Sequence, residues 1–293
     1  MHPIISLVVP TLNASKEIPA LLRLVELQSH PPDEVVVIDS SSDDETTQLA
    51  SLCRLVKVIT IPREKFDHGS TRHHAFLETK GDYVLFITQD ALPASKSYIE
   101  KLLIPFEDPE VAMVSGRQLP KPDAKRFEQL VRLFNYPDSS NIRSAQDIPK
   151  LGVKTFFASD SCSAYRRTAY FECGGFERPC KTNEDMLMAA TFIHAGWKVA
   201  YAANAEVLHS HNLNPVEQYR RNREIGRFLK LYSDRLCEES EVSEGGRLVK
   251  DVAKQLIHER NYSELVSFVV DCSARFLGNR SGRLSVRKES DRQ

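Results

Sequence analysis

Five short apolar segments, separated by stretches with helical spacing, constrain the fold of this chain more than any other feature. Each segment is rich in β-branched residues and poor in polar ones, which is typical of strands buried on both faces. They are Ile4–Val9, Glu34–Ile38, Val56–Ile61, Tyr83–Ile87 and Val111–Ser115. Because helical patterns lie between them, the order strand, helix, strand predicts an α/β domain with a mainly parallel sheet flanked by helices.

The helical patterns define the rest of the chain's organisation. Apolar residues recur at helical spacing at Ile18, Leu21, Leu22 and Val25, and the acids Asp43, Asp44 and Glu45 precede a second helix. Three more helical stretches follow residue 213, at 214–236, about 246–258 and about 263–277. We therefore expect a catalytic domain at 1–213, a helical region at 214–278 and a disordered basic tail at 279–293. The apolar stripes of the C-terminal helices could also mediate formation of a homo-oligomer.

Composition excludes several classes of protein. The 293 residues include 39 basic and 40 acidic side chains, which gives no electrostatic reason to expect a nucleic-acid partner. The six cysteines form no CxxC pair, so we interpret them as reduced thiols of a cytoplasmic protein. No segment approaches the roughly 20 apolar residues that span a bilayer. The basic tail could favour a peripheral position on the inner face of the cell membrane, and a simply solvated tail is the alternative.

Polar motifs follow three of the predicted strands. Val9 is followed by PTLN, Ile38 by DSSSDDET and Ile87 by TQDALP. Open α/β sheets bind ligands beyond the carboxyl ends of their strands, so these motifs should meet at one rim of the sheet. Thr11 and Asp39 suit the hydrogen-bonding edges of a nucleobase or a ribose. Neither strand is followed by the glycine-rich loop that a Rossmann dinucleotide site or a P-loop requires.

Six motifs in this order resemble those of family 2 glycosyltransferases of the GT-A fold. They are VVPTLN, VIDSSSDDET, FDHGSTRHHA, FITQDALP, CGGF followed by NEDMLMA, and VLHSHN. The combination of the third, fourth and last motifs is most similar to bacterial rhamnosyltransferases. The resemblance covers roughly residues 4–212 and implies a nucleotide-diphospho-sugar transferase fold with a C-terminal helical extension.

The resemblance implies a divalent cation, Mg²⁺ or Mn²⁺, at the diphosphate of the donor. Asp90 is the candidate carboxylate ligand, and it is a single one because Thr88 stands where the wider family has a second aspartate. One carboxylate can suffice, since such cations also take phosphate oxygens and water. His209 and His211 are the other candidate ligands, because alternate residues of an extended segment point to the same side. The alternatives are that Asp90 caps the next segment and that the histidines belong to an ordinary polar loop.

Other residues are assigned by the resemblance to the nucleotide-sugar donor. Arg72 is similar to the family's basic residue near the diphosphate, which an arginine can hold in bidentate fashion. His73 departs from the asparagine expected beside it. The residues implied in donor binding are Pro10, Thr11, Asn13, Asp39, His68, Gly69, Arg72, Gln89 and Asp90.

A pair of acids, Glu184 and Asp185, begins a stretch with helical spacing. By resemblance Asp185 is the catalytic base for the acceptor hydroxyl, and Glu184 and Asp160 line the acceptor site. Acids in the first turn of a helix often serve only to cap it. Such a capping role is the alternative for Glu184. For Asp160 the alternative is a structural role.

The resemblance therefore implies an inverting, metal-dependent hexosyltransferase in cell-surface polysaccharide synthesis. The expected donor is dTDP-L-rhamnose, and the expected acceptor is a saccharide or a lipid-linked saccharide. The same chemistry with a UDP-hexose or UDP-N-acetylhexosamine is the first alternative. A nucleotide-sugar-binding protein without turnover and a nucleotidyltransferase are the others. The presence of both Asp90 and Asp185 disfavours the former, and the absence of a glycine-rich triphosphate motif disfavours the latter.

Overall fold

The computed structural model describes residues 2–236 and 241–290. The chain forms two compact units. The first comprises Met1–Gln118, Pro137–Gln146 and Phe156–His209, and the second Leu119–Tyr136, Asp147–Thr155 and Ser210–Gln293. Segments from the middle of the chain therefore group with the C-terminal helices in the second unit. The functional division at residue 213 stays a prediction.

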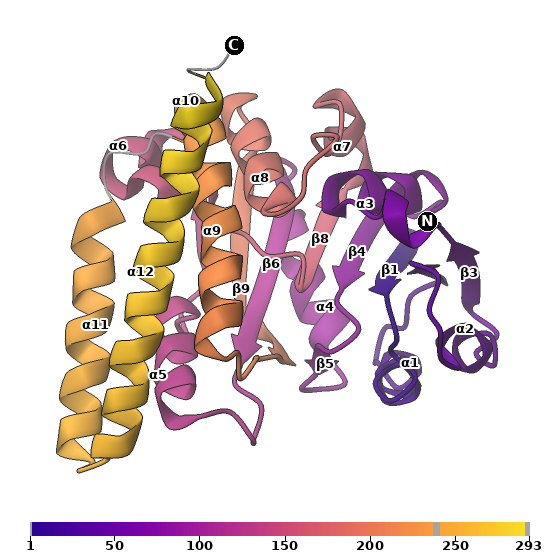
Figure 1. The fold of residues 1–293 in the computed structure, drawn as a ribbon. Helices are drawn as coiled ribbons and strands as arrows, with labels where there is room; N and C mark the ends of the chain where they lie inside the picture. Colours follow the sequence, from indigo (N-terminus) through magenta and orange to yellow (C-terminus); the bar gives the residue numbers. More distant parts are fainter. Residues whose placement is uncertain (1, 237–240, 291–293) are drawn as a thin grey trace. The chain divides into compact units, whose positions relative to one another are not determined.

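A parallel half-sheet in the first unit holds four of the five predicted strands. They are β1 (Ile5–Thr11), β2 (Glu34–Asp39), β3 (Val56–Thr60) and β4 (Tyr83–Ile87), in the order β3-β2-β1-β4 (Figure 1). The register places Leu7 of β1 opposite both Val35 and Leu85. Leu7, Val35 and Leu85 are buried, because the central strands are covered on both faces. The four predicted strands are confirmed to within two residues at each end.

The other half of the sheet is mixed. It continues from β4 with β8 (Cys162–Arg166), β6 (Val111–Leu119), β9 (Lys198–Leu208) and β5 (Leu92–Pro93), and β7 (Asn141–Arg143) pairs with β9. Strand β8 runs antiparallel to β4 and to β6, and β9 runs antiparallel to β5 and to β7. The prediction of a mainly parallel sheet therefore holds for the first half alone. The apolar pattern of a strand indicates that the strand is buried, but it does not indicate whether the neighbouring strands run parallel or antiparallel to it.

Helices pack on this sheet and position the candidate site. Helix α1 (Ile18–Glu26) buries the four apolar residues predicted for it, and α2 (Thr46–Ala50) follows the acids of the second motif. The remaining α-helices assigned wholly to the first unit are α3 (His68–Leu77), α4 (Tyr98–Leu103), α7 (Arg167–Glu172) and α8 (Glu184–His194). Helices α3 and α8 carry His68, Arg72, Glu184 and Asp185, which belong to the second cluster described below.

The second unit is helical in the part that the structure describes. Its α-helices are α5 (Arg126–Asn135), α6 (Ile148–Leu151), α9 (Pro215–Leu231), α10 (Ser233–Leu236), α11 (Glu241–His258) and α12 (Tyr262–Ser290). A cluster of buried apolar side chains from α5, α11 and α12 forms a core: Phe127, Val131, Val252, Leu256 and Phe268. Helix α9 begins with a capping box, in which Asn214 and Glu217 satisfy each other's backbone N–H groups.

Glycines allow α9 and α12 to approach each other closely. A Cβ atom on Gly278 or Gly282 of α12 would overlap the carbonyl oxygen of Tyr219 or Arg223 on α9, and one on Gly226 of α9 would overlap the carbonyl of Asn279. Helix α12 itself extends to Ser290. The prediction of disorder from residue 279 is therefore corrected for residues 279–290, because composition alone could not reveal the helix partner. Residues 291–293 lie outside the described part.

Two other predictions concern the whole chain. The cysteines in the described part are free thiols, while Cys237 lies outside that part. Among the described residues, no helix is long and apolar enough to cross a membrane.

Candidate active site

The loops after β1, β2 and β4 meet at one rim of the sheet, as their motifs predicted. The hydroxyl of Thr11 donates to the carboxylate of Asp39 at 2.9 Å. The amide of Gln89 bonds to both backbone groups of Leu12, accepting from N at 2.8 Å and donating to O at 3.2 Å. These bonds fix the three loops relative to one another, although the bonded residues are 28 and 77 positions apart in the sequence.

Asp39 is enclosed by this rim. Its side chain is fully buried and accepts from Thr11, from the Ser42 hydroxyl at 2.5 Å and from the Ser42 backbone N–H at 2.8 Å. Asn13 has a left-handed backbone (φ 51°) and ties the first loop to the second by accepting from the N–H of Asp43. Asp39 thus orients its neighbours, and Ser42 is a rim residue that the sequence analysis did not single out.

Asp90 pairs with His209 in the first unit. Nε2 of His209 lies 3.4 Å from Oδ2 of Asp90, and Nδ1 of the same ring lies 2.8 Å from Oε1 of Gln118. Gln118 in turn donates its amide N–H to the Ser159 hydroxyl at 2.8 Å. With the amide oxygen of Gln118 beside Nδ1, Nε2 is the ring nitrogen that faces Asp90, and a cation bound there would be met by the Nδ1–H tautomer of His209.

This donor set fits a divalent cation. A carboxylate oxygen and an imidazole nitrogen face each other, and a hydrogen-bonded second side chain holds the ring, which is the usual support of a ligating histidine. Asp90 is partly exposed, with 22% of its side-chain surface accessible, so a phosphate oxygen could reach the same cation. His211, the third candidate ligand, belongs to the second unit, and its role stays a prediction.

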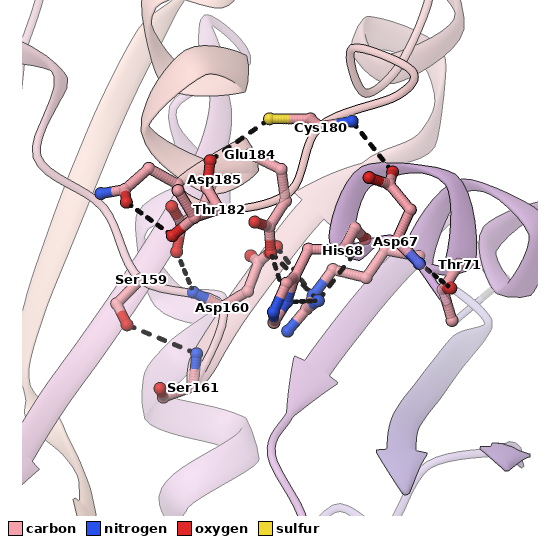
Figure 2. Close-up of polar contacts among 12 residues, drawn as sticks. Asp67, His68, Thr71, Ser159, Asp160, Ser161, Cys180, Thr182, Glu184 and Asp185 are labelled. Carbon is pink, nitrogen blue, oxygen red and sulfur yellow. Dashed lines mark hydrogen bonds and ion pairs between the residues drawn. The ribbon is translucent and has the colours of Figure 1, made fainter. Parts of the chain in front are cut away.

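A second cluster lies where α3 meets the start of α8 and is drawn in Figure 2. Arg72 of α3 contacts Glu184 of α8 (Nη1 to Oε1, 3.0 Å) and Asp160 (Nε to Oδ2, 3.3 Å), and all three side chains are at most 5% exposed. Nδ1 of His68 lies 3.0 Å from the same Nη1 of Arg72. The guanidinium predicted to hold a diphosphate thus already contacts both of the predicted acceptor-site acids.

Asp185 stands at the edge of this cluster. Its Oδ2 accepts from the backbone N–H of Asp160 at 2.9 Å, and its Oδ1 accepts from the N–H of Met186 at 2.7 Å. Asp160 itself accepts from the hydroxyls of Ser163 and Tyr165, each at 2.6 Å. The backbone N–H of Asp160 therefore positions Asp185, while the side chain of Asp160 is held by two hydroxyls of strand β8.

The cluster places three carboxylates around one cation. Burial, reinforced by Asp185 and Asp160, raises the pKa of Glu184 to about 8 against the opposing charge of Arg72. Burial and the neighbouring Asp185 raise the pKa of Asp160 to about 6. Burial also raises the pKa of Asp185, although the N–H groups that it accepts from oppose the shift. A carboxylate with a raised pKa is a stronger base, which suits proton abstraction near neutral pH.

The FDHG motif has a structural explanation in this region. Asp67 caps α3 by accepting from the N–H of Ser70 and also accepts from the N–H of Cys180, both through Oδ1. Gly69 lies against the carbonyl of Glu177 and leaves no room for a Cβ atom. These contacts hold α3 against the loop before α8, so that His68 faces Glu184 (Figure 2). Arg72 contacts the same carboxylate.

One segment connects the two clusters. The Ser159 hydroxyl holds Gln118 beside His209, and the next residue, Asp160, donates its N–H to Asp185. Gln118, Ser159, Ser163 and Tyr165 were missed by the sequence analysis. Of these, only Gln118 could have been suspected from the sequence, because it is a polar residue near the end of an apolar strand.

Comparison with known proteins decides the family. The family model described as glycosyl transferase family 2 matches residues 6–174. The chain belongs to family 2 of the glycosyltransferases. It is 44% identical over 225 residues to the O-antigen chain rhamnosyltransferase RfbN of Salmonella typhimurium, which covers 76% of this chain and 72% of that protein. It is 41% identical over 228 residues to the O-antigen chain rhamnosyltransferase WbaN of Salmonella anatum, covering 77% and 72%.

Solved structures agree on the fold of this glycosyltransferase. The mannosyltransferase PcManGT of Pyrobaculum calidifontis, solved with GDP-Man and Mn²⁺, superposes with a TM-score of 0.68 at 16% identity and covers 96% of this chain and 87% of that one. The TarS 1–349 structure from S. aureus gives a TM-score of 0.54 at 17% identity, covering 98% and 92%. The predicted GT-A fold and the predicted family are confirmed.

Proposed function

We propose that this glycosyltransferase transfers L-rhamnose from dTDP-L-rhamnose to a hydroxyl of a saccharide or lipid-linked saccharide. It would act on the cytoplasmic side of the membrane in cell-surface polysaccharide synthesis. The 44% identity to a protein named as an O-antigen chain rhamnosyltransferase, over 72% of that protein, is the observation that carries the donor.

Asp185 is the proposed base. It is held by two backbone N–H groups and has a raised pKa, so it can take the proton of the acceptor hydroxyl. The acceptor oxygen would then attack the anomeric carbon, and the bond from that carbon to the diphosphate oxygen would break with its electron pair. A single displacement of this kind inverts the anomeric configuration.

Asp90 and His209 are the proposed ligands of Mg²⁺ or Mn²⁺, with His211 as a third. A divalent cation bound there would neutralise charge on the diphosphate as it leaves. Gln118 would keep the His209 ring in the ligating tautomer.

For Arg72 we propose a positioning role, and the donor-binding role that the resemblance implied stays a prediction. Its contacts with two buried acids favour this positioning role, in which it holds Glu184 and the Asp160 segment that supports Asp185. The donor would then be bound chiefly by the rim and by the start of α3. The residues proposed there are Pro10, Thr11, Asn13, Asp39, His68, Gly69 and Gln89.

Ligand-dependent melting of the purified chain tests the donor. A ligand that binds the native state raises the melting temperature, so dTDP-L-rhamnose with Mn²⁺ should raise it more than UDP-glucose or UDP-GlcNAc does. A preference for a UDP-sugar would instead favour the alternative donor. That alternative has some support, because TarS, a poly(ribitol-phosphate) β-N-acetylglucosaminyltransferase, is 30% identical over 146 residues, although these make up only 25% of that protein.

Product stereochemistry tests the mechanism separately. A β-linked donor should give an α-linked rhamnoside in the NMR spectrum of the product. Retained configuration would reject the single displacement, and donor binding without any turnover on saccharide acceptors would favour a binding protein.

A further inference from the structure

Helix α12 presents an exposed hydrophobic stripe along one face. At about 100° per residue, nine residues between 262 and 284 point within about 60° of the direction of Ser273. All nine are exposed, and all except Ser273 and Arg280 are large hydrophobic residues. We call these nine residues the outer stripe: Tyr262, Val266, Val269, Val270, Ser273, Phe276, Leu277, Arg280 and Leu284.

The opposite face of α12 is covered within the same unit. Phe268 belongs to the core that α12 shares with α5 and α11, and Gly278 and Gly282 lie against the backbone of α9. Figure 1 shows α12 between α11 and α9, and it packs on both. The outer stripe is therefore the face of α12 that the described residues of this chain leave open to solvent.

The outer stripe has the spacing of a coiled-coil seam. Its members from Tyr262 to Arg280 follow one another at intervals of four, three, four, three and four residues, the alternation with which paired helices meet. Val270, Leu277 and Leu284 recur every seven residues and widen the seam on one side. A helix at the surface of a monomer usually has polar residues on its solvent face. The seam therefore indicates that another helix packs against it.

The exposed area is close to what a stable dimer needs. The hydrophobic members of the outer stripe are between 45% and 65% exposed. Residues of these types present about 150–250 Å² each when fully accessible, so together they offer roughly 700 Å² per copy. The largest hydrophobic patch of a typical monomer is only about 300–600 Å². A standard protein interface buries about 800 Å² per partner, and Ser273 and Arg280 supply part of the remainder.

We propose that the outer stripe binds the outer stripe of a second copy of this chain, with the two α12 helices antiparallel about a two-fold axis at Ser273. Residues 262–284 are centred on position 273, so this axis brings residues at equal distances on either side of Ser273 together. The small side chain of Ser273 meets its own copy at the axis and allows close approach. The inference rests on the helical unit alone and does not depend on the proposed chemistry. The facing sets are Tyr262 with Leu284, Val266 with Arg280, and Val269 and Val270 with Phe276 and Leu277.

The antiparallel direction keeps the two copies of Arg280 apart. Arg280 of each copy lies opposite Val266 of the other, so the two arginines are about 14 residues, or about 21 Å, apart along the helices. This separation exceeds the Debye length of about 8 Å at physiological ionic strength. A parallel pairing would bring the two arginines together, and like charges brought together oppose association.

Sedimentation velocity of the full chain at increasing concentration measures the association. The wild type should form a dimer. V266R should raise the dissociation constant at least about tenfold, because it sets an arginine opposite Arg280 of the second copy. The matched control is L52R, which introduces the same charge at an exposed hydrophobic residue of the first unit, where Leu52 is 78% exposed. L52R should leave the dissociation constant near the wild-type value.

A charge swap tests the direction and the register of the pairing. V266R/R280E places the introduced arginine of each copy opposite the introduced glutamate of the other. The double variant should recover at least about tenfold of the affinity that V266R loses, which also shows that charge and not misfolding weakens V266R. In a parallel pair the double variant would stay weak, since each introduced group would face its own copy.

Disulfide cross-linking locates the two-fold axis. S273C should form an intermolecular disulfide on mild oxidation, because the two side chains meet at the axis. S267C is the matched control, since Ser267 is exposed on the same helix and points about 120° away from Ser273. S267C should give no more linked dimer than the wild type, which already contains the natural cysteines.

Four results would overturn the proposal. They are a wild type that stays monomeric at every concentration, wild-type association by V266R, no recovery by V266R/R280E, and no more linked dimer from S273C than from S267C. A monomeric wild type that cosediments with phospholipid vesicles, and loses that binding in V266R, would assign the outer stripe to a membrane surface instead. A dimer that V266R weakens, V266R/R280E restores and S273C links supports the antiparallel pair.

Discussion

Replacing Glu184 by glutamine tests the electrostatics of the buried cluster directly. Glu184 is 3% exposed, and its pKa in the folded protein is raised from 4.5 to about 8. A carboxyl whose pKa is raised on folding stabilises the native state through its protonated form. That contribution is fully present below pH 4.5 and is lost as the pH rises through about 8. The wild type should therefore become less stable between pH 5 and pH 9.

The size of the effect follows from the same two values. The difference between 4.5 and about 8, at about 1.4 kcal/mol per pH unit, corresponds to at most about 5 kcal/mol. The measured value should be smaller, because Asp160 and Asp185 take up part of the same proton equilibrium. Glutamine resembles the neutral acid and can still accept from Arg72 through its amide oxygen. E184Q should therefore match the wild type at pH 5 and exceed its free energy of unfolding at pH 9.

Urea unfolding at both pH values measures this difference. The matched control is E78Q, because Glu78 is exposed and its pKa is lowered by its bond to Lys57, so it is ionised at both pH values. Between pH 5 and pH 9 the stability difference between E78Q and the wild type should change much less than that for E184Q, because only the solvent-exposed contact of Glu78 with His74 depends on pH in this range. The reasoning is refuted if E184Q is the less stable protein at pH 9. That result would mean that the ion pair with Arg72 outweighs the cost of burying the Glu184 charge.

Three further predictions concern the site and the helical unit. D185N should lower turnover by about 10²-fold or more and leave donor affinity nearly unchanged in calorimetry, because the amide cannot accept the proton; a loss of donor binding would contradict its role as base. Q118L should weaken Mn²⁺-dependent donor binding by about 10- to 100-fold and leave binding in EDTA unchanged, since His209 loses its support. G282A should lower the free energy of unfolding by about 1–3 kcal/mol, because the added methyl group would overlap the Arg223 carbonyl. The control G246A places its methyl group in open space and should not destabilise the protein. Equal melting temperatures for the two variants would reject close packing of α9 on α12.

Local patterns in the sequence predicted the elements and the rim. Four strands of the parallel half were located within two residues, because burial on both faces selects uninterrupted β-branched segments. The motifs after β1, β2 and β4 predicted a common rim because parallel strands end on the same side. The order of six motifs was sufficient to indicate the family.

Only the tertiary structure decided which charged side chains meet. Arg72, Asp160 and Glu184 are separated by 88 and 24 residues, and no periodicity links them, so their pairing depends on how α3, β8 and α8 are arranged. The same holds for Gln118 beside His209. The raised pKa values depend on the loss of water around these groups, which is a property of the packed fold. The sequence by itself determined which residues are available for the chemistry, and the fold decided their partners and their charge, because pairing and desolvation act between segments that are far apart in the chain.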